Sequence, residues 1–384
     1  MSDTPADMPA RRPRAFVLLA RGFGATAWRA RFESGALIGM NEPLAYGYFH
    51  AADQGIDVTY GEDLPEGRLS RLLRLGIRAV TGFDFLHAWR QRDQIACADI
   101  VWTHTESQSL AVGAVWRLLP RVRRPRLLLQ QIWLIDRWPG FSPLRRWVYR
   151  WLLAPADVLT FHSPLNTELA REIFPEHRCE LVRFGIAADQ KTPPRLIRSG
   201  GVLRVLALGS DRHRDWATLI DAVEGCADLH LTIVSGTIPA HLLAGKPNVA
   251  RAKITRNEDL FACYAQADVV ALSLKPNLHV SGSTVSQEAA VMGVPAVISD
   301  VGGLRAYFDD SCVTYVPPGD AAALRAALRA QATDPEAARQ RALRAQAQMS
   351  AEGLSSRAFA RDHARLSIDI ICETRSFHDG NIDR

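Results

Sequence analysis

The feature that most constrains the fold is a series of short apolar runs, each followed by a longer segment of helical or mixed periodicity. In the first half the strand-like runs are residues 16–20, 57–60, 100–103, 126–130, 158–161 and 181–184. In the second half they are residues 203–208, 229–234, 269–272, 296–299 and 312–316. Alternation of strands with helices is typical of parallel α/β sheets. We therefore expect an α/β protein with two tandem Rossmann-like, doubly wound domains that face a cleft.

The two series are separated by residues 186–200, which lack periodicity and are rich in turn-forming residues. We predict an N-terminal acceptor-binding domain over 15–185, a linker over 186–200 and a C-terminal nucleotide-sugar-binding domain over 201–354. The polar residues 1–14 are expected to form a disordered tail. The helical pattern within 355–384 is expected to cross back to the N-terminal domain. In such folds ligands bind at the carboxyl ends of the strands.

The composition excludes several classes of protein. Hydrophobic residues make up 47% of the chain and charged residues 23%, which is usual for a globular protein and not for a disordered one. No apolar run approaches the ~20 residues that span a bilayer, and none has the form of a signal peptide. The six cysteines lack the spacing of a zinc site or a disulfide framework. We expect a cytoplasmic protein.

Positive charge is concentrated in residues 67–150, which hold 15 arginines and 5 acidic residues. Two stretches there, 68–78 and 144–153, place arginines beside leucine or aromatic residues at helical spacing. Such helices can lie in the interface of an anionic membrane, or they can bury their apolar face against a sheet. Both interpretations stay open. No RNA-binding signature occurs, so we expect no nucleic-acid partner.

Residues 280–303, VSGSTVSQEAAVMGVPAVISDVGG, contain the most informative pattern. A loop of small residues from Ser281 to Thr284 leads into a predicted helix, whose free N–H groups suit a phosphate. Glu288 follows one turn further in, where a carboxylate could accept hydrogen bonds from ribose hydroxyls. Gly293 is expected to end the helix before the next strand.

This segment resembles the signature of GT-B glycosyltransferases of family 4 (glycosyl transferases group 1), in which a glycine-containing loop leads into a helix reading Glu-Ala-x-x-x-Gly-x-Pro. The turn VPPGD at residues 316–320 resembles one at the same place in that family. The resemblance implies the GT-B fold and a nucleotide-diphosphate sugar donor whose ribose binds Glu288. The residues that would hold the diphosphate and the sugar are Ser281, Gly282, Ser283 and Thr284.

The chain departs from the family pattern at two places. Many members carry a second glutamate eight residues before Glu288, where this chain has Val280 beside His279. The glutamate expected shortly after the double glycine is absent, with Arg305 in that region. The arrangement around His279 is closer to glycosyltransferases of bacterial exopolysaccharide assembly, and His279 joins the candidate donor-binding residues. The donor sugar and the stereochemistry of transfer stay open.

A second loop of interest, residues 209–216, precedes a predicted amphipathic helix. In the family this loop holds an Arg and a Lys that neutralise the leaving diphosphate, and Arg212 and Arg214 would take these roles here. Positive charge at this place stabilises the leaving group as the glycosidic bond breaks. We therefore expect no metal and no cofactor. By the same resemblance the nucleotide base would rest on the backbone of Lys253 and Ile254.

A glycine loop after the first strand, Gly22-Phe-Gly24-Ala-Thr26-Ala, matches the dinucleotide fingerprint G-x-G-x-x-A. The acidic residue that the fingerprint requires about 20 residues further on is missing. We interpret Gly22, Gly24 and Thr26 as an acceptor-side loop that faces the cleft.

Titratable residues follow two later strands of the first domain: His104 and Glu106 after one, and Asp136 after the other. A general base at such a strand end could deprotonate an acceptor hydroxyl. An inverting enzyme would use Asp136 or Glu106, whereas in a retaining enzyme His104 would contact the sugar or the acceptor. A structural role is open for all three.

The leading hypothesis is sugar transfer to a saccharide or lipid-linked saccharide in the synthesis of bacterial cell-surface polysaccharide or glycolipid. Under it the protein works in the cytoplasm or peripherally on the inner face of the membrane. Two alternatives share the fold: a sugar-nucleotide 2-epimerase, and a non-catalytic module that binds nucleotide sugars. The sequence leaves the base, the sugar, the acceptor and the oligomeric state open.

Overall fold

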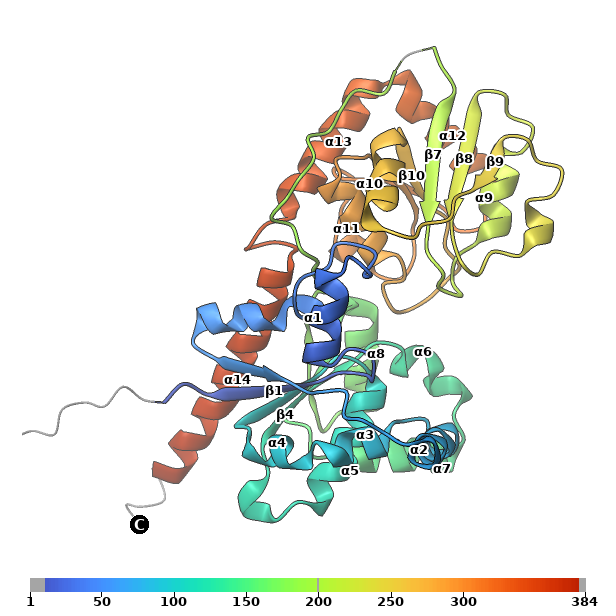
Figure 1. Cartoon of the computed structure of the whole chain (residues 1–384). Coiled ribbons are helices and arrows are strands. Elements are labelled where there is room, and N and C mark those ends of the chain that lie inside the picture. The colour runs from blue at the N-terminus through green and yellow to red at the C-terminus, as the bar shows by residue number, and fades with distance from the viewer. Residues whose placement is uncertain (1–10, 199, 380–384) are drawn as a thin grey trace, which may run out of the picture.

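The computed structural model describes residues 11–198 and 200–379, which form two six-stranded sheets flanked by helices (Figure 1). The strand order is β2-β1-β3-β4-β5-β6 in the first sheet and β12-β11-β10-β7-β8-β9 in the second. Neighbouring strands in both sheets run parallel. The predicted pair of parallel α/β sheets is confirmed.

The N-terminal sheet is buried between two layers of helices. Its strands are β1 (Arg14–Leu18), β2 (Asp57–Tyr60), β3 (Ile100–Thr103), β4 (Arg126–Gln131), β5 (Val158–Phe161) and β6 (Arg178–Leu181). Its helical segments are α1 (Ala25–Glu33), η1 (Ala45–Gln54), α2 (Arg68–Thr81), α3 (Phe85–Arg90), α4 (Arg92–Cys97), α5 (Glu106–Leu118), η2 (Arg121–Arg123), α6 (Leu134–Arg137), η3 (Trp138–Gly140), α7 (Pro143–Leu153) and α8 (Pro164–Ile173). All residues of β3 and β5 are buried, as expected for parallel strands covered on both faces.

The C-terminal sheet repeats this arrangement. Its strands are β7 (Leu203–Leu208), β8 (Leu229–Val234), β9 (Val249–Arg251), β10 (Val269–Leu272), β11 (Ala296–Ser299) and β12 (Thr314–Val316). Its helical segments are α9 (Trp216–Val223), η4 (Ala240–Leu242), α10 (Asn257–Gln266), α11 (Ser283–Val291), η5 (Leu304–Ala306), α12 (Ala321–Thr333) and α13 (Pro335–Gln348). The three-residue edge strand β9 was not predicted, because so short a run shows no periodicity in the sequence.

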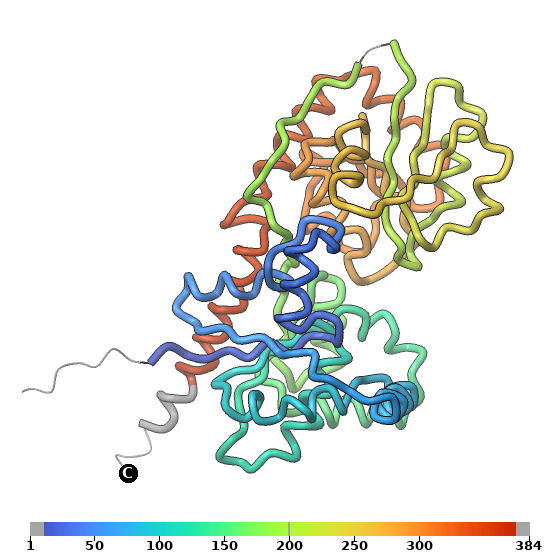
Figure 2. The backbone as a smooth tube through the Cα atoms, viewed as in Figure 1, coloured from blue at the N-terminus to red at the C-terminus, as the bar shows by residue number. Residues whose placement is uncertain are grey.

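A long helix, α14 (Ser356–Asp379), leaves the C-terminal domain and crosses over the N-terminal sheet (Figures 1 and 2). Phe359 and Leu366 of α14 are buried in the same apolar core as Tyr48 and Trp102 of the N-terminal domain. The indole Nε1 of Trp102 donates a hydrogen bond to Ser367 Oγ at 2.9 Å. The two domains are therefore tied by packing as well as by the linker.

The chain crosses between the domains twice, and the two crossings touch. A Cβ on Gly185 would lie 2.0 Å from the carbonyl oxygen of Ser355, so only glycine fits at this contact. The domain boundaries given above stay predictions. Residues 1–10 of the predicted tail, and residues 380–384, lie outside the described residues. Within the described residues, no helix is both long and apolar enough to cross a bilayer.

Candidate functional site in the interdomain cavity

Both domains line one cavity of about 360 Å³. The N-terminal domain contributes aromatic side chains to its wall, and the C-terminal domain contributes polar ones. The residues that matter below are Trp28, Tyr46, Trp133, Arg214, His279 and Glu288. A second hollow, of about 820 Å³, adjoins it and is lined by Lys253, Ile254 and the end of β7. Thr284 and Glu288 line both spaces.

The start of α11 presents backbone N–H groups to the cavity. Gly282 is its N-cap, with φ 91°, and no side chain among the described residues caps it. A side chain at Gly282 would be strained by this φ and would lie 3.3–3.4 Å from Leu272, Leu274 and Arg214. Ser281, Ser283 and Thr284 also line the cavity. This open helix start can accept an anion.

Arg214 is buried beside that helix start. Its Nε donates to the carbonyl oxygen of Leu208 at 2.9 Å, and its Nη1 donates to Ser281 Oγ at 3.3 Å. Both partners are neutral, and no carboxylate forms an ion pair with Arg214 in the described part of the chain. Burial lowers the pKa of Arg214, but an arginine stays protonated in proteins. The charge of the nearby Asp211 carboxylate opposes this effect of burial, so the site holds a buried cation whose hydrogen-bond partners are both neutral.

Arg212, the other arginine predicted to bind the diphosphate, is exposed and lines neither space. The two arginines are two residues apart in the chain and differ in environment. Only Arg214 lies against the helix start.

Glu288 is buried one turn into α11, and its Oε2 accepts a hydrogen bond from Tyr264 Oη at 2.9 Å. Burial raises its pKa above the usual range, despite hydrogen bonds from Tyr264 and from the backbone of Met40. Met40 belongs to residues 35–42 of the N-terminal domain, which we call the strap. Asn257 holds the strap through Gly39: the Gly39 N–H donates to Asn257 Oδ1 at 2.8 Å, and Asn257 Nδ2 donates to Gly39 O at 3.3 Å.

His279 lies between carboxylates from both domains. Its Nδ1 is 3.0 Å from Asp136 Oδ1, and its Nε2 is 3.9 Å from Asp211 Oδ2. Burial lowers the pKa of His279, but the two carboxylates outweigh this effect and raise it. Although burial opposes it, the hydrogen bond to His279 lowers the pKa of Asp136, and the interaction with His279 across 3.9 Å lowers the pKa of Asp211. A carboxylate with a lowered pKa is a weak base, and Asp136 faces His279.

The described part of the chain contains one group of side chains that could bind a metal ion. Ligand atoms of Asp136, His213 and His279 lie within 4.8 Å of one another. The contact between Asp136 and His279 uses two of these groups in an ion pair. The expected absence of a metal stays a prediction.

His104 forms part of the cavity wall, and Glu106 lies behind it. His104 lines the cavity, stacks on Tyr46 with ring centroids 3.6 Å apart, and contacts Tyr48 Oη through Nδ1 at 2.9 Å. Burial lowers the pKa of His104 well below its usual value, so the ring is neutral. Glu106 accepts from the Trp133 N–H at 3.2 Å and does not line the cavity.

The glycine loop before α1 is closed by its own chain. The N–H groups of Gly22 and Gly24 donate to the Asp63 carboxylate at 3.0–3.3 Å, and Thr26 donates to Glu62 at 2.9 and 3.1 Å. Gly22, Gly24 and Thr26 are not among the residues that line the cavity. The carboxylates occupy the place that a phosphate would need.

Two features of the site were not predicted: the contact of the strap with Glu288, and Tyr46. Tyr46 has φ 64° and ψ 9°, a conformation that costs free energy in a residue with a side chain. Its ring packs against Phe23 and His104 on the N-terminal side of the cavity. The cluster of glycines at 35, 39 and 47 is the sequence signal that could have indicated unusual backbone here. In the structure each of these glycines has a positive φ.

Comparisons with known proteins agree with this arrangement. Residues 203–334, about a third of the chain, match the family described as glycosyl transferases group 1. Sucrose-phosphate synthase from Thermosynechococcus elongatus has a similar structure, with a TM-score of 0.70 and 17% identity over 94% of this chain and 100% of that one.

HepE from Anabaena, solved with UDP and glucose, has a TM-score of 0.62 at 13% identity, over 92% of this chain and 98% of that one. A glycosyltransferase from Rickettsia africae has a TM-score of 0.62 at 12% identity, over 94% and 99%. No curated protein sequence matches this chain. The predicted resemblance and the predicted GT-B fold are confirmed.

Proposed function

We propose that this chain, whose residues 203–334 match glycosyl transferases group 1 and whose fold is similar to that of GT-B glycosyltransferases, moves a sugar from a nucleoside diphosphate to a saccharide or lipid-linked saccharide. The observation that carries this proposal is the buried charge of Arg214, which donates only to neutral groups, beside the start of α11, which no described side chain caps. A buried cation is stable only with an anionic partner. A diphosphate in the interdomain cavity supplies that partner.

The donor would lie along the two adjoining spaces. Its diphosphate would accept hydrogen bonds from Arg214 and from the N–H groups at the start of α11, which stabilise the charge that develops on the leaving group. Its base would lie in the larger hollow near Ile254. HepE has been solved with UDP-glucose, which supports a UDP-sugar as the first donor to test. Arg212 would then act only at the rim.

The ribose would bind Glu288 by taking over contacts that the strap makes. The carboxylate of Glu288 already accepts from Tyr264 and Met40, and we infer that the strap releases Met40 when the donor enters. The strap and the ribose therefore compete for the carboxylate of Glu288. Donor binding and strap movement are coupled in this proposal.

The transferred sugar and the acceptor would lie on the aromatic side of the cavity. His279 takes the place beside the missing family glutamate, and its Nε2 has no hydrogen-bond partner within the described structure. We assign this Nε2 to the donor phosphate or sugar, and we assign Asp136 to holding the ring from its Nδ1 side. Tyr46 and Trp133 offer faces on which a sugar ring can stack.

Within the proposal, His104 and Glu106 position this wall. His104 supports the ring of Tyr46, and Glu106 fixes the backbone of Trp133. A lipid-linked acceptor would bring the enzyme to the inner face of a membrane, in the synthesis of cell-surface polysaccharide or glycolipid.

The proposal is tested by calorimetric titration of the full chain with UDP, GDP and ADP, for the native protein and for Glu288→Gln. We expect one nucleotide to bind and the variant to lose about tenfold in affinity, since a hydrogen bond to a charged group contributes about 1.5 kcal/mol or more. Glu258→Gln, at an exposed glutamate of α10, is the matched control and should bind as the native protein does. Equal affinity in native protein and Glu288→Gln would remove the ribose assignment.

Turnover separates the remaining alternatives. Nucleotide release that requires an added saccharide supports transfer. Inversion at C2 of a UDP-sugar without any added acceptor favours the 2-epimerase, and binding without release or inversion favours the non-catalytic module.

A further inference from the structure

Helix α2 exposes its leucines and buries an arginine, which is the reverse of the usual arrangement of a surface helix. Among its residues, all of which the structure describes, only Arg74 is buried. Leu69 is 84% exposed, Leu72 67% and Leu73 59%. A surface helix normally buries its apolar stripe and exposes its charges. The exposed leucines of α2 therefore have no apolar partner that buries them within the described part of the chain.

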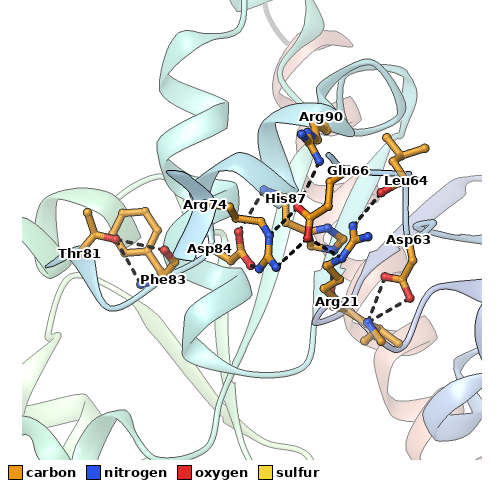
Figure 3. Close-up of polar contacts among 12 residues, drawn as sticks. Arg21, Asp63, Leu64, Glu66, Arg74, Thr81, Phe83, Asp84, His87 and Arg90 are labelled. Carbon is orange, nitrogen blue, oxygen red and sulfur yellow. Dashed lines mark hydrogen bonds and ion pairs between the residues drawn. The ribbon is translucent and has the colours of Figure 1, made fainter. Parts of the chain in front are cut away.

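An ion-pair network takes the place of apolar packing in holding α2 (Figure 3). Arg74 Nη1 lies 2.6 Å from Asp84 Oδ2, and Arg74 Nε and Nη2 each lie 3.0 Å from an oxygen of Glu66. Arg21 and Arg90 approach the same Glu66 carboxylate at 3.3 and 3.5 Å. Hydrogen bonding from Arg74 lowers the pKa of Glu66. The ion pairs of Arg74 thus hold the helix on the domain, and its leucines remain exposed to solvent.

A second helix continues the apolar surface. Tyr149 Oη of α7 donates to the carbonyl oxygen of Thr81, the last residue of α2, at 2.9 Å. On α7, Leu144 is 70% exposed and Trp147 63%. We call the exposed residues Leu69, Leu72, Leu73, Leu144 and Trp147 the α2–α7 face.

The charge around this face indicates what covers it. Helix α2 carries four arginines and α7 three, and neither helix contains an acidic residue. Arg68, Arg71 and Arg78 of α2 are exposed. A second copy of the chain, seated face to face, would bring these like charges together. A bilayer with anionic headgroups offers both an apolar layer and phosphates for the arginines.

We propose that the α2–α7 face docks on an anionic lipid bilayer, with its leucines and Trp147 in the interfacial layer and its arginines on the headgroup phosphates. This deepens the proposed function, on which it rests for the lipid-linked acceptor, by naming the surface that would bring the cavity to the membrane. The contact itself is measured without donor or acceptor, so the two proposals can fail separately.

The test is co-sedimentation of the full chain with phosphatidylcholine vesicles, with and without phosphatidylglycerol. We expect binding to the vesicles that contain phosphatidylglycerol and a loss of binding as salt is raised, because headgroup attraction is screened. The double variant Leu69→Gln/Leu72→Gln should lose about tenfold or more in binding, since each leucine removes apolar area from the interface. Arg68→Gln/Arg71→Gln should lose about tenfold.

The matched control is Leu196→Gln/Val202→Gln, two exposed apolar residues outside the α2–α7 face, 54% and 52% exposed. It should bind vesicles as the native chain does. All variants are checked by thermal unfolding and by nucleotide titration, which should be unchanged. Absence of vesicle binding, or equal loss in the control, would overturn the proposal. Sedimentation velocity showing a dimer that the leucine variant abolishes would overturn it in favour of a second copy.

Discussion

The two domains each bury an arginine, and the partners of the two arginines differ. In the N-terminal domain Arg74 meets the carboxylates of Glu66 and Asp84, which raise its pKa despite partial burial. In the C-terminal domain Arg214 donates hydrogen bonds to a carbonyl and a hydroxyl, and burial lowers its pKa although the charge of Asp211 opposes this effect. The first charge is neutralised by the fold. The charge of Arg214 has no ion-pair partner among the described residues and is available to an anionic ligand.

The glycine loops of the two domains teach the same lesson. Both follow a sheet strand and lead into a helix whose free N–H groups could bind an anion. Asp63 and Glu62 satisfy N–H groups before and at the start of α1 through their side chains, whereas no described side chain caps the start of α11, where the Ser283 N–H donates to the carbonyl oxygen of Val280. Binding capacity depends on what the rest of the chain leaves unoccupied, and similar local patterns do not guarantee it.

The largest effect should come from removing the neutralised arginine. Arg74→Met leaves Asp84 buried without its counter-charge and Glu66 with only the longer contacts to Arg21 and Arg90, which should lower the free energy of unfolding by about 3 kcal/mol. Nucleotide affinity of the folded variant should stay within about twofold. Urea unfolding and UDP titration measure the two quantities. Arg71→Met, an exposed neighbour on α2, is the control and should change stability by less than about 0.5 kcal/mol.

A change of stability as small as that of the control would mean that α2 is not held by this network. A large change in UDP affinity would instead erase the distinction between the two arginines.

The ion pair between Asp136 and His279, which joins the domains, should give a change of intermediate size. Asp136→Asn should lower the free energy of unfolding by about 2 kcal/mol, because the hydrogen bond to His279 loses its charge. The raised pKa of His279 gives stability that is complete below its unfolded pKa of about 6.5 and is lost as pH rises through the folded pKa. The lowered pKa of Asp136 gives stability that is complete above about pH 4 and is lost as pH falls.

The difference between native protein and Asp136→Asn should therefore peak near pH 5 to 6 and shrink towards pH 9. Urea unfolding at a series of pH values measures it, with Asp93→Asn at an exposed aspartate as control. A difference that does not vary with pH would show that the pair is not ionised.

The smallest effect should come from loosening the strap. Asn257→Ala removes two hydrogen bonds to Gly39, so the strap should leave Glu288 more easily. UDP affinity should rise by about threefold to tenfold, which corresponds to about 1 kcal/mol of lost competition. Asn41→Ala, which removes a contact within the strap, is the control. A fall in UDP affinity would mean that the strap forms part of the donor site.

The sequence predicted the donor side of the site better than the acceptor side, for a physical reason. The open helix start and Glu288 lie within eight residues of one another, so a local pattern captures their geometry. Tyr46 and the strap become relevant only through contacts with residues more than 50 positions away, such as Asn257 and His104. Such contacts depend on how the two sheets are placed, which periodicity does not encode.

The same limit explains the glycine loop of the N-terminal domain. Its pattern suggested a loop open to the cleft, but the parallel pairing of β1 with β2 brings Asp63 and Glu62 to it. The sequence pattern also predicted an amphipathic helix at α2, and the structure has a helix there. Which side faces outward was decided by the partners of Arg74, which lie on two separate loops.

The most direct test of the central claim compares two arginines two residues apart in one loop. UDP is titrated into the native chain, Arg214→Met and the exposed-site control Arg212→Met, with unfolding measured in parallel. We predict that Arg214→Met loses about 10- to 100-fold in UDP affinity, as expected for a charge-assisted contact of about 1.5–3 kcal/mol, with no loss of stability, and that Arg212→Met changes affinity by less than about threefold. Equal affinities in all three proteins would show that the buried charge of Arg214 does not hold the donor.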